Sequence, residues 1–315
     1  MKAWRVHDFG EPETMKFENV PAPEPGPGQV LIKVAAAGLN FFDILQVQGK
    51  YQIKPPFPFI PGAEVAGTVE GTGERVLAMV SGGGFGEYVA ADTKRIAPVP
   101  KGMDLATAAA VPVVYQTSYF ALKDRAALRA GEWLLVHAAA SGVGVTAVQL
   151  GRAWGARVIA TAGSQEKLDF AKSLGAEHAL SYNDGTWVDA VKEITGGRGA
   201  DVIYDPVGGD VFDLSSKCIA SGGRLLVIGF ASGRIPTIAA NRILLKNMSV
   251  VGAVWGGHVQ ANPSYAGETQ RALGEMFESG QLRPPSPVSY SLADAPRALR
   301  DLANRKVLWK AVLAS

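Results

Sequence analysis

The chain has 315 residues, which is enough for two domains of ordinary size. Apolar residues make up 47% of it and charged residues 19%, a composition that is typical of a well-cored globular protein and excludes a disordered chain. The formal net charge of +2 is too small to predict nucleic acid or an anionic membrane surface as the main partner.

The cysteine content and the hydropathy of the chain bear on its cellular compartment, on metal binding and on membrane insertion. Cys218 is the only cysteine, so no internal disulfide can form, which fits a reducing compartment and predicts a cytoplasmic location. One cysteine and four histidines leave no cluster with metal-ligand spacing, so we expect no metal. The N-terminus lacks the apolar core of a signal peptide, and polar residues and glycines interrupt the most apolar run, residues 134–150. We therefore expect no membrane span.

In chain order, the composition and the predicted secondary structure divide the sequence into three parts. The first part is rich in glycine and proline, with short strands expected at residues 29–36, 75–80 and 87–91, and this pattern indicates a mostly-β domain. The middle part alternates strands, near residues 133–138, 157–162, 178–180, 201–205, 223–229 and 249–255, with helices, near residues 142–154, 165–174, 186–195 and 210–220. Six strands with crossover helices predict a doubly wound parallel sheet. The tail, from residue 260, holds two helices and a last strand at 311–313, and we expect it to fold back onto the first domain.

The most informative stretch is residues 136–146, VHAAASGVGVT. An apolar strand enters a turn of small residues that opens an amphipathic helix, and a second apolar strand follows at 157–162. Such a unit lays a dinucleotide pyrophosphate on a helix N-terminus, and the predicted contacts are the backbones of Ala140, Ser141, Gly142 and Val143. The match to the glycine fingerprint is degraded, because only Gly144 keeps its place. An ordinary tight turn between strand and helix is the alternative.

The residues after the second strand bear on which dinucleotide binds. An NAD-selective site carries Asp or Glu near Ala162, and this chain has none there. Gly163, Ser164 and Lys167 follow instead, and the hydroxyl and the cation suit the 2′-phosphate of NADPH. The alternative is that Ser164 caps the next helix and Lys167 is a solvated surface charge.

Several segments together resemble the medium-chain dehydrogenase/reductase superfamily, in its zinc-free quinone oxidoreductase (zeta-crystallin-like) branch. They are residues 37–43 (AGLNFFD), 48–51 (QGKY), 61–67 (PGAEVAG), 136–146 and 204–209 (YDPVGG). The resemblance covers nearly the whole chain. It implies a GroES-like, mostly-β catalytic domain of residues 1–116 and 257–315, and a Rossmann domain of residues 117–256 with a doubly wound parallel sheet.

Departures from the zinc-dependent members concern two ligand positions. Those members carry Cys where this chain has Asn40 and His where it has Ala63, and neither an amide nor a methyl group replaces these zinc ligands. Without a metal, hydrogen bonds must polarise the substrate. The resemblance implies that Asn40, Tyr51 and Thr117 border the nicotinamide and the substrate. Alternatively, Asn40 caps a helix, Tyr51 packs in a loop and Thr117 fills a core.

Three further residues are implied as cofactor contacts by similar reductases and by the sheet topology. Tyr182 follows the third strand of the nucleotide domain and reaches the 2′-phosphate in similar enzymes, unless it only packs on the surface. Gly208 and Phe230 follow the fourth and fifth strands at the edge where open α/β sheets bind ligands. His137 is expected to be a structural histidine.

These features predict an NADPH-dependent, zinc-independent reductase that transfers a hydride to a quinone or a related conjugated carbonyl. One alternative is an enone or enoyl-thioester (acyl-CoA) reductase, in which an acid such as Tyr51 matters more. An alternative of another class is an NADPH-binding protein with a structural or RNA-regulatory role, which the small net charge does not support. The apolar last strand, residues 249–255, predicts a homodimer that pairs two sheet edges.

Overall fold

The computed structural model describes residues 1–183 and 185–315. It divides the chain into two compact units. The first unit comprises Met1–Val114, Ser264–Gly280 and Pro284–Ser315, and the second comprises Tyr115–Pro263 and Gln281–Arg283. The boundary falls inside helix α3 (Pro112–Tyr119). None of the helices in these ranges is long and apolar enough to cross a membrane.

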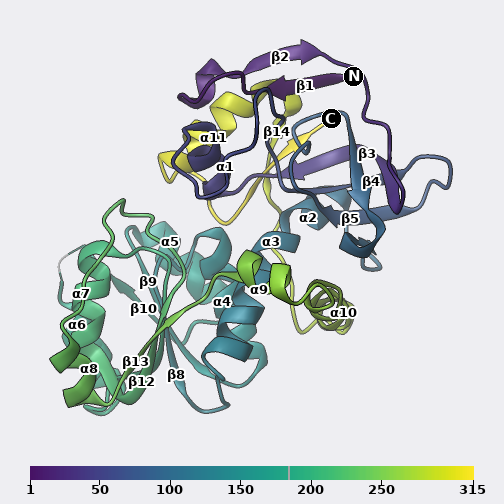
Figure 1. Ribbon diagram of the computed structural model, residues 1–315. Helices are drawn as coiled ribbons and strands as arrows, with labels where there is room; N and C mark the ends of the chain where they lie inside the picture. Colours follow the sequence, from purple (N-terminus) through teal and green to yellow (C-terminus); the bar gives the residue numbers. More distant parts are fainter. Residues whose placement is uncertain (184) are drawn as a thin grey trace. The chain divides into compact units, whose positions relative to one another are not determined.

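The first unit is built on a seven-stranded sheet in the order β14-β15-β3-β4-β5-β7, with β6 pairing with β3. The strands are β3 (Gln29–Gly38), β4 (Glu64–Val69), β5 (Arg75–Met79), β6 (Tyr88–Asp92), β7 (Ile96–Pro98), β14 (Val288–Ser291) and β15 (Ala311–Ala314). A separate antiparallel pair joins β1 (Lys2–Arg5) to β2 (Lys16–Asn19). The helices are α1 (Phe41–Val47), α2 (Leu105–Ala110), α10 (Tyr265–Glu278) and α11 (Ala295–Ala303). This arrangement confirms the GroES-like, mostly-β class (Figure 1).

The tail of the chain completes that sheet. β15 pairs antiparallel with β3, with Val312 opposite Gly38. All but its last residue are buried, and the strand lies between β14 and β3 in the sheet. Ile32, Val34 and Ala37 of β3 belong to the core of this unit, and the alternation shifts by one residue after Val34, where the pairing with β4 is irregular. The expectation that the tail folds back onto the first domain is confirmed.

The second unit holds a six-stranded sheet, all of whose pairs are parallel, in the order β10-β9-β8-β11-β12-β13. Its strands are β8 (Trp133–Val136), β9 (Arg157–Ala162), β10 (His178–Ser181), β11 (Ala200–Asp205), β12 (Ile219–Val227) and β13 (Ser249–Gly252). The strand order reverses beside β8, so the carboxyl ends of β8 and β11 lie at the switch point where such sheets bind ligands.

Helices cover both faces of this sheet. Figure 1 shows α4 (Gly142–Ala153) and α5 (Gln165–Ser173) on one face, and α6 (Trp187–Ile194), α7 (Gly209–Cys218) and α8 (Ala240–Lys246) on the other. Right-handed crossovers produce this division when the chain first steps outward from β8 and then returns to β11. The doubly wound Rossmann class is therefore confirmed.

Two boundaries and one helix of the second unit illustrate where the structure departs from the sequence prediction. β12 begins at Ile219, where a helix was expected to continue, because α7 ends at Cys218 and the chain goes directly into the strand. The strand expected at residues 249–255 ends at Gly252, and Trp255 starts α9 (Trp255–Ala261). Helix α8 was not predicted. Its sequence, ANRILLK, places three apolar residues in a row and shows no helical periodicity, and none of its residues is fully buried.

Candidate active site

The turn after β8 forms the cap of α4. Ser141 is the N-cap residue, and its Oγ accepts the backbone N–H of Gly144 at 3.2 Å. The backbone N–H of Ala139 donates to the Thr161 carbonyl at 3.0 Å, which ties the turn to the neighbouring strand β9. The capping side chain and this backbone bond hold the turn that the sequence predicts as the phosphate-binding segment.

Close packing explains why one glycine of the fingerprint remains. A Cβ on Gly144 would collide with the Ala138 carbonyl oxygen and would lie 2.8 Å from the Ala139 Cα. Ala138 itself has a positive φ of 47°, a conformation that non-glycine residues seldom adopt outside tight, well-supported turns. The backbone of the turn thus passes directly against the first turn of α4, and position 144 admits only glycine.

The N-terminus of α4 leaves donors for a ligand. Ser141 satisfies the N–H of Gly144, and Val145 donates to the Ser141 carbonyl at 2.9 Å. The N–H groups of Gly142 and Val143 have no acceptor among residues 1–183 and 185–315. Two free N–H groups at the positive end of a helix dipole suit a pyrophosphate. The residues present therefore fit a dinucleotide.

The segment after β9 gathers most of the predicted 2′-phosphate contacts. Ala162 is buried and offers no polar side chain. Ser164 caps α5, and its Oγ accepts the Lys167 backbone N–H at 3.4 Å, so the capping role foreseen as the alternative is present. A Cβ on Gly163 would lie 3.4 Å from the Tyr182 ring, which places this tyrosine directly beside the segment. Ser164 is exposed and Lys167 half-buried.

Asn183, which the sequence analysis does not predict, helps to hold the segment after β9 in place. Its Nδ2 donates to the Gly163 carbonyl at 3.0 Å, while its own backbone N–H donates to Ser181 Oγ at 3.3 Å. These bonds connect the end of β10 to the end of β9. A signal for it was the Tyr-Asn pair directly after the third strand, since asparagine commonly bonds backbone groups in turns.

Gly208 and Phe230 meet at the carboxyl ends of β11 and β12. Gly208 has φ 69° and ψ −155°, a region open to glycine, and a Cβ there would lie 3.0 Å from the Phe230 ring. Asp205 Oδ1 accepts the N–H groups of Val207 and Gly208 at 2.7 and 3.0 Å, which shapes the turn. Burial raises the pKa of the Asp205 carboxyl to about 6.

His137 is structural, as expected. Its ring is fully buried, with Nδ1 2.7 Å from Thr161 Oγ1 and Nε2 2.8 Å from Ser215 Oγ. Burial lowers the pKa of the imidazole to about 3, so the ring is neutral at physiological pH. It ties β8, β9 and α7 together beneath the nucleotide turn.

In the first unit, Asn40 stands at the N-cap of α1, and the nitrogen and the oxygen of its amide each make a side-chain hydrogen bond. Its Nδ2 donates to Glu64 Oε1 at 2.8 Å, and its Oδ1 accepts from Lys310 Nζ at 2.9 Å. Lys310 Nζ also donates to Glu64 Oε1 at 2.5 Å. The other carboxylate oxygen of Glu64 accepts the Val113 backbone N–H at 2.8 Å. Asn40, Glu64 and Lys310 are 6%, 0% and 2% exposed, so this is a buried polar network.

Asp43 and Tyr51 lie close to that network. Asp43 Oδ2 accepts the Asn40 backbone N–H at 2.7 Å, and its carboxyl is fully buried. Burial, opposed by that hydrogen bond and by the Lys310 charge, raises the pKa of Asp43 to about 7. Tyr51 stacks on Phe42 of α1, and burial together with the Asp43 charge raises the pKa of its phenol. The structure thus brings Asn40 and Tyr51 together around α1.

Thr117 belongs to the second unit and is half-buried on α3. Its neighbour Ser118 is fully buried, with Oγ 2.8 Å from Tyr204 Oη and 2.7 Å from Thr146 Oγ1. Ser118 also donates to the Val143 carbonyl at 3.1 Å. Through these bonds α3 is fixed to β11 and to the first turn of α4, so Thr117 has a defined place beside the nucleotide turn.

A catalytic zinc ion does not fit the donor set. Asn40 and Ala63 stand at the two ligand positions, and the Asn40 amide is already held by Glu64 and Lys310. No group of three or more His, Cys, Asp or Glu residues is placed to hold a metal ion anywhere in residues 1–183 and 185–315.

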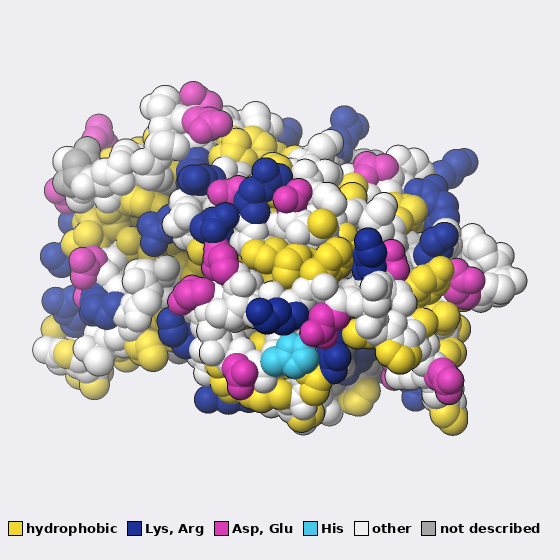
Figure 2. All heavy atoms as spheres, turned by 90° about the horizontal axis from the view of Figure 1, so that it is seen from above, with side chains coloured by type: hydrophobic (Ala, Val, Ile, Leu, Met, Phe, Trp, Pro, Cys, Tyr) yellow, Lys and Arg dark blue, Asp and Glu magenta, His cyan; other side chains and the backbone are white. Residues whose placement is uncertain are grey.

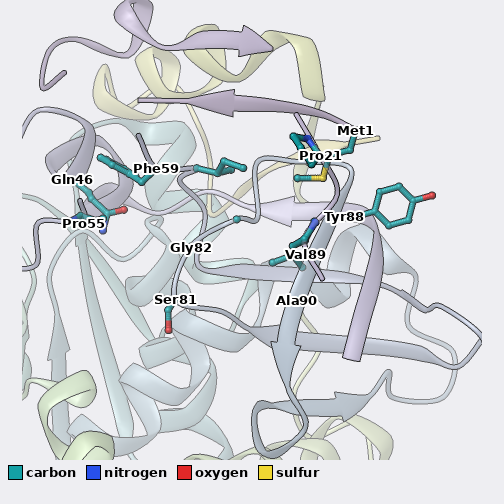
Figure 3. Close-up of a pocket in the computed structure, with 13 residues that line it drawn as sticks. Met1, Pro21, Gln46, Pro55, Phe59, Ser81, Gly82, Tyr88, Val89 and Ala90 are labelled. Carbon is teal, nitrogen blue, oxygen red and sulfur yellow. The ribbon is translucent and has the colours of Figure 1, made fainter. Parts of the chain in front are cut away.

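A pocket of about 440 Å³ in the first unit is distinct from these residues. Figure 3 shows it running from Gln46, Pro55 and Phe59 toward Met1, Tyr88 and Val89. Its lining is mostly apolar, and none of the predicted catalytic residues contributes to it.

Sequence reasoning missed the partners of Asn40. Neither Glu64 nor Lys310 is predicted from the sequence as a contact of this amide. A signal was present for both, since each is a single charge inside an apolar segment, VAG after Glu64 and AVLA after Lys310. Charges in such segments are rarely buried unless they are paired.

Comparison with known proteins agrees with this geometry. The family model for the alcohol dehydrogenase GroES-like domain matches residues 26–101, and the zinc-binding dehydrogenase model matches residues 142–271. A quinone oxidoreductase-like protein 2 homolog from Nematostella vectensis is 38% identical over 91% of this chain and 82% of its own length.

Two solved structures extend the likeness. The quinone oxidoreductase of Thermus thermophilus, solved alone and with NADPH, is 37% identical with a TM-score of 0.89, and covers 100% of both chains. The quinone oxidoreductase of Escherichia coli complexed with NADPH is 27% identical with a TM-score of 0.92, again over 100% of both chains. The fold, the nucleotide turn, the donor set without zinc ligands and these relatives agree, and the chain belongs to the zinc-free quinone oxidoreductase family of the medium-chain dehydrogenase/reductase superfamily.

Proposed function

We propose that this protein is an NADPH-dependent, zinc-independent reductase that transfers a hydride to a quinone or a related conjugated carbonyl. The observation that carries the proposal is the chemistry at position 40. A buried asparagine amide, fixed by a buried ion pair, stands where zinc-dependent members of the superfamily hold a metal ligand. Relatives that share this fold over their whole length include the quinone oxidoreductases of Thermus thermophilus and Escherichia coli, each solved in complex with NADPH.

NADPH is the cofactor that the second unit fits. The N–H groups of Gly142 and Val143 receive the pyrophosphate, and Gly144 permits the close approach. Ser164, Lys167 and Tyr182 surround the place of the 2′-phosphate, with Ala162 offering no carboxylate to a ribose hydroxyl. Gly208 and Phe230 border the nicotinamide half. When bound, NADPH supplies a hydride.

The protein's own residues orient and stabilise the acceptor. A quinone that takes up a hydride gains two electrons and becomes a hydroquinone monoanion, and one proton from solvent or from Tyr51 then gives the hydroquinone. Asn40 and Tyr51 donate hydrogen bonds to the oxygen on which charge develops. A neutral donor set suffices because the product anion is already stabilised by its aromatic ring.

The test is NADPH oxidation, followed at its absorbance band, against a panel of quinones, enones and acyl-CoA thioesters. Turnover of quinones with NADPH supports the proposal. Turnover confined to enones or thioesters supports the enone or enoyl-thioester alternative, in which the hydride reaches the β-carbon and Tyr51 supplies the α-proton. Turnover of none of the panel supports an NADPH-binding structural role.

Small molecules are the proposed partners, without nucleic acid. On the face drawn in Figure 2, Lys and Arg side chains are interspersed with Asp and Glu side chains, and a charge pattern of this kind does not favour a polyanion. A cytoplasmic location belongs to the same proposal, supported by the free, buried thiol of Cys218.

A homodimer through the edge of the second sheet is also proposed. β13 is the last strand in the sheet order, and large apolar side chains beside it in sequence are exposed, Leu244 by 73%, Leu245 by 78% and Val254 by 75%. An unpaired edge next to exposed apolar groups favours pairing with a second copy. Leu245→Lys should lower the solution mass to that of a monomer, whereas Val288→Lys on the exposed strand β14 should not. A wild-type monomer at micromolar concentration would refute the dimer.

A further inference from the structure

Lys310 buries its ammonium group among three acceptors. Its Nζ donates to the Leu39 carbonyl at 2.6 Å, to Asn40 Oδ1 at 2.9 Å and to Glu64 Oε1 at 2.5 Å. The side chains of Lys310 and Glu64 are only 3% and 0% exposed. A buried ion pair is tolerated when hydrogen bonds satisfy its remaining groups, and each ammonium proton has an acceptor here.

The backbone around Lys310 is strained, which indicates that its position matters. Trp309 has φ 59°, in the left-handed region, although its large side chain is 2% exposed. Such a conformation persists only where the surrounding structure imposes it, and strain of this kind gathers at functional sites. The strained residue leads directly into β15, so the point where the lysine side chain starts is fixed on both sides.

A glycine at position 38 leaves space for the ion pair between Lys310 and Glu64. Gly38, at the end of β3, faces Glu64, and a Cβ at this position would lie 2.5 Å from Glu64 Oε1 and would collide with the Ala109 carbonyl oxygen. Because glycine stands there, the Glu64 carboxylate can approach the strand and reach both Asn40 and Lys310.

The two charges decide which end of the Asn40 amide faces which way. A carboxylate only accepts hydrogen bonds and an ammonium only donates them, so Nδ2 must face Glu64 and Oδ1 must face Lys310. In a flipped amide both bonds would be lost, because the amide oxygen would face the Glu64 carboxylate and the amide NH₂ group would face the Lys310 ammonium. One Nδ2 proton remains, and it has no acceptor within the ranges 1–183 and 185–315.

We propose that Lys310 and Glu64 are positioning residues that lock Asn40 as a pure hydrogen-bond donor, with one N–H left for the carbonyl oxygen of the hydride acceptor. The inference rests on the proposed function, in which Asn40 contacts the acceptor. It specifies the acceptor chemistry at this point, because a donor-only group favours an oxygen that gains negative charge over a hydroxyl that needs an acceptor. A donor held in place before the reaction needs no reorganisation during it.

The main test variant is the charge-neutral pair Lys310→Met/Glu64→Gln. It removes both charges together, so neither is left buried alone. The new carboxamide at position 64 can both donate and accept, which frees the Asn40 amide to turn. We expect kcat with a quinone to fall about 10- to 100-fold, since misplacing one oxyanion donor costs on this order. The dissociation constant for NADPH should stay within about twofold, because these residues lie outside the nucleotide unit.

A double-mutant cycle separates positioning from general stability. Asn40→Ala should lower kcat by a similar factor, and adding Lys310→Met/Glu64→Gln to it should lower kcat no further, because the pair acts through Asn40. An equal factor in both backgrounds would overturn the proposal. The matched control is Arg224→Met/Glu132→Gln, which removes an ion pair of 3.0 and 2.6 Å in the second unit and should leave kcat nearly unchanged.

A second measurement does not depend on turnover. In protein labelled with ¹⁵N-asparagine, the Asn40 side-chain signal is assigned by its loss in Asn40→Ala. Its two amide protons should exchange with solvent at rates that differ by about tenfold or more, since one is bonded to buried Glu64. Equal rates in the wild type would overturn the locked donor. If no acceptor is reduced, the proposed function fails, while this measurement still decides whether the amide is locked.

Discussion

The phenol ring of Tyr51 stacks on the ring of Phe42, with centroids 5.4 Å apart and planes inclined by 30°. The Tyr51 backbone N–H donates to the Leu45 carbonyl at 3.1 Å, so ring and backbone are both attached to α1. The N-cap of that helix is Asn40. Both proposed donors are therefore held by the same helix, Asn40 at its N-cap and Tyr51 by its contacts with Phe42 and Leu45.

Tyr51→Phe should keep the ring stack and remove only the hydroxyl. With an enone or thioester that needs a proton at carbon, we expect turnover to fall about 10²- to 10⁴-fold, the usual loss for a positioned acid. With a quinone the loss should be much smaller, because the product anion is stable. NADPH affinity should not change. Steady-state rates with each acceptor test this, with Tyr119→Phe as the control, and unchanged rates with every acceptor would remove Tyr51 from the catalytic residues.

The fold of the nucleotide domain could be predicted from the sequence because the patterns that identify it lie close together along the chain. A strand, a turn of small residues, a helix and a second strand lie within about 30 residues, the length of one βαβ unit. Gly144 could be recognised from its spacing alone, and its contact with Ala138 explains that spacing. Helix α8 escaped prediction because its three large apolar residues are consecutive in the sequence and none of its residues is fully buried.

The environment of Asn40 could not be predicted in the same way. Asn40, Glu64 and Lys310 are separated by 24 and 246 residues along the chain, and they meet only because β15 inserts beside β3. Local pattern indicates that a lone charge in an apolar segment needs a partner, but it does not identify the partner. Which amide proton of Asn40 stays available follows only from the assembled ion pair.

Gly144→Ala should weaken NADPH binding by disturbing the turn. The new methyl group would collide with the Ala138 carbonyl, which is backbone and cannot rotate away, and overpacking of this kind costs about 1–3 kcal/mol. We expect NADPH affinity to fall about tenfold or more, at tenfold per 1.4 kcal/mol. Gly274→Ala in α10 is the control, because its Cβ meets nothing within 4 Å. Fluorescence titration of both variants decides, and equal affinities would contradict the packing argument.

Asp43→Asn should change how stability depends on pH. The folded-state pKa of Asp43 is about 7, against an ordinary value of 3.8, so the folded protein binds more protons than the unfolded chain between these values. The free energy of unfolding of the wild type should therefore fall as pH rises from about 4 to 7, by on the order of 2–4 kcal/mol. The carboxamide of the variant keeps an acceptor for the Asn40 N–H and does not titrate.

The measurement is urea unfolding of both proteins at pH 4.5 and pH 8. Asp43→Asn should gain stability over the wild type at pH 8 and little at pH 4.5. Lys310, Glu64 and Tyr51 face Asp43 in both proteins, and His137, whose lowered pKa favours the folded state at higher pH, titrates equally in both. The difference between the two proteins therefore isolates Asp43. A difference that does not vary with pH would show that the carboxyl ionises normally.

Cofactor selectivity gives the last prediction. Ser164 caps α5, Lys167 follows one turn later, Tyr182 lies against Gly163, and Ala162 neither bonds a ribose hydroxyl nor repels a phosphate. Charge-assisted hydrogen bonds contribute about 1.5–3 kcal/mol each before screening, and the exposure of Ser164 lowers the expected total to roughly 2–4 kcal/mol. That corresponds to a preference for NADPH over NADH of about 30- to 1000-fold.

Lys167→Ala should remove about tenfold of this preference, and raising the salt concentration should reduce the rest. Lys172→Ala, exposed on the same helix, should remove none. Dissociation constants for NADPH and NADH that agree within a factor of two in the wild type would leave Ser164 as a helix cap and Lys167 as a surface charge.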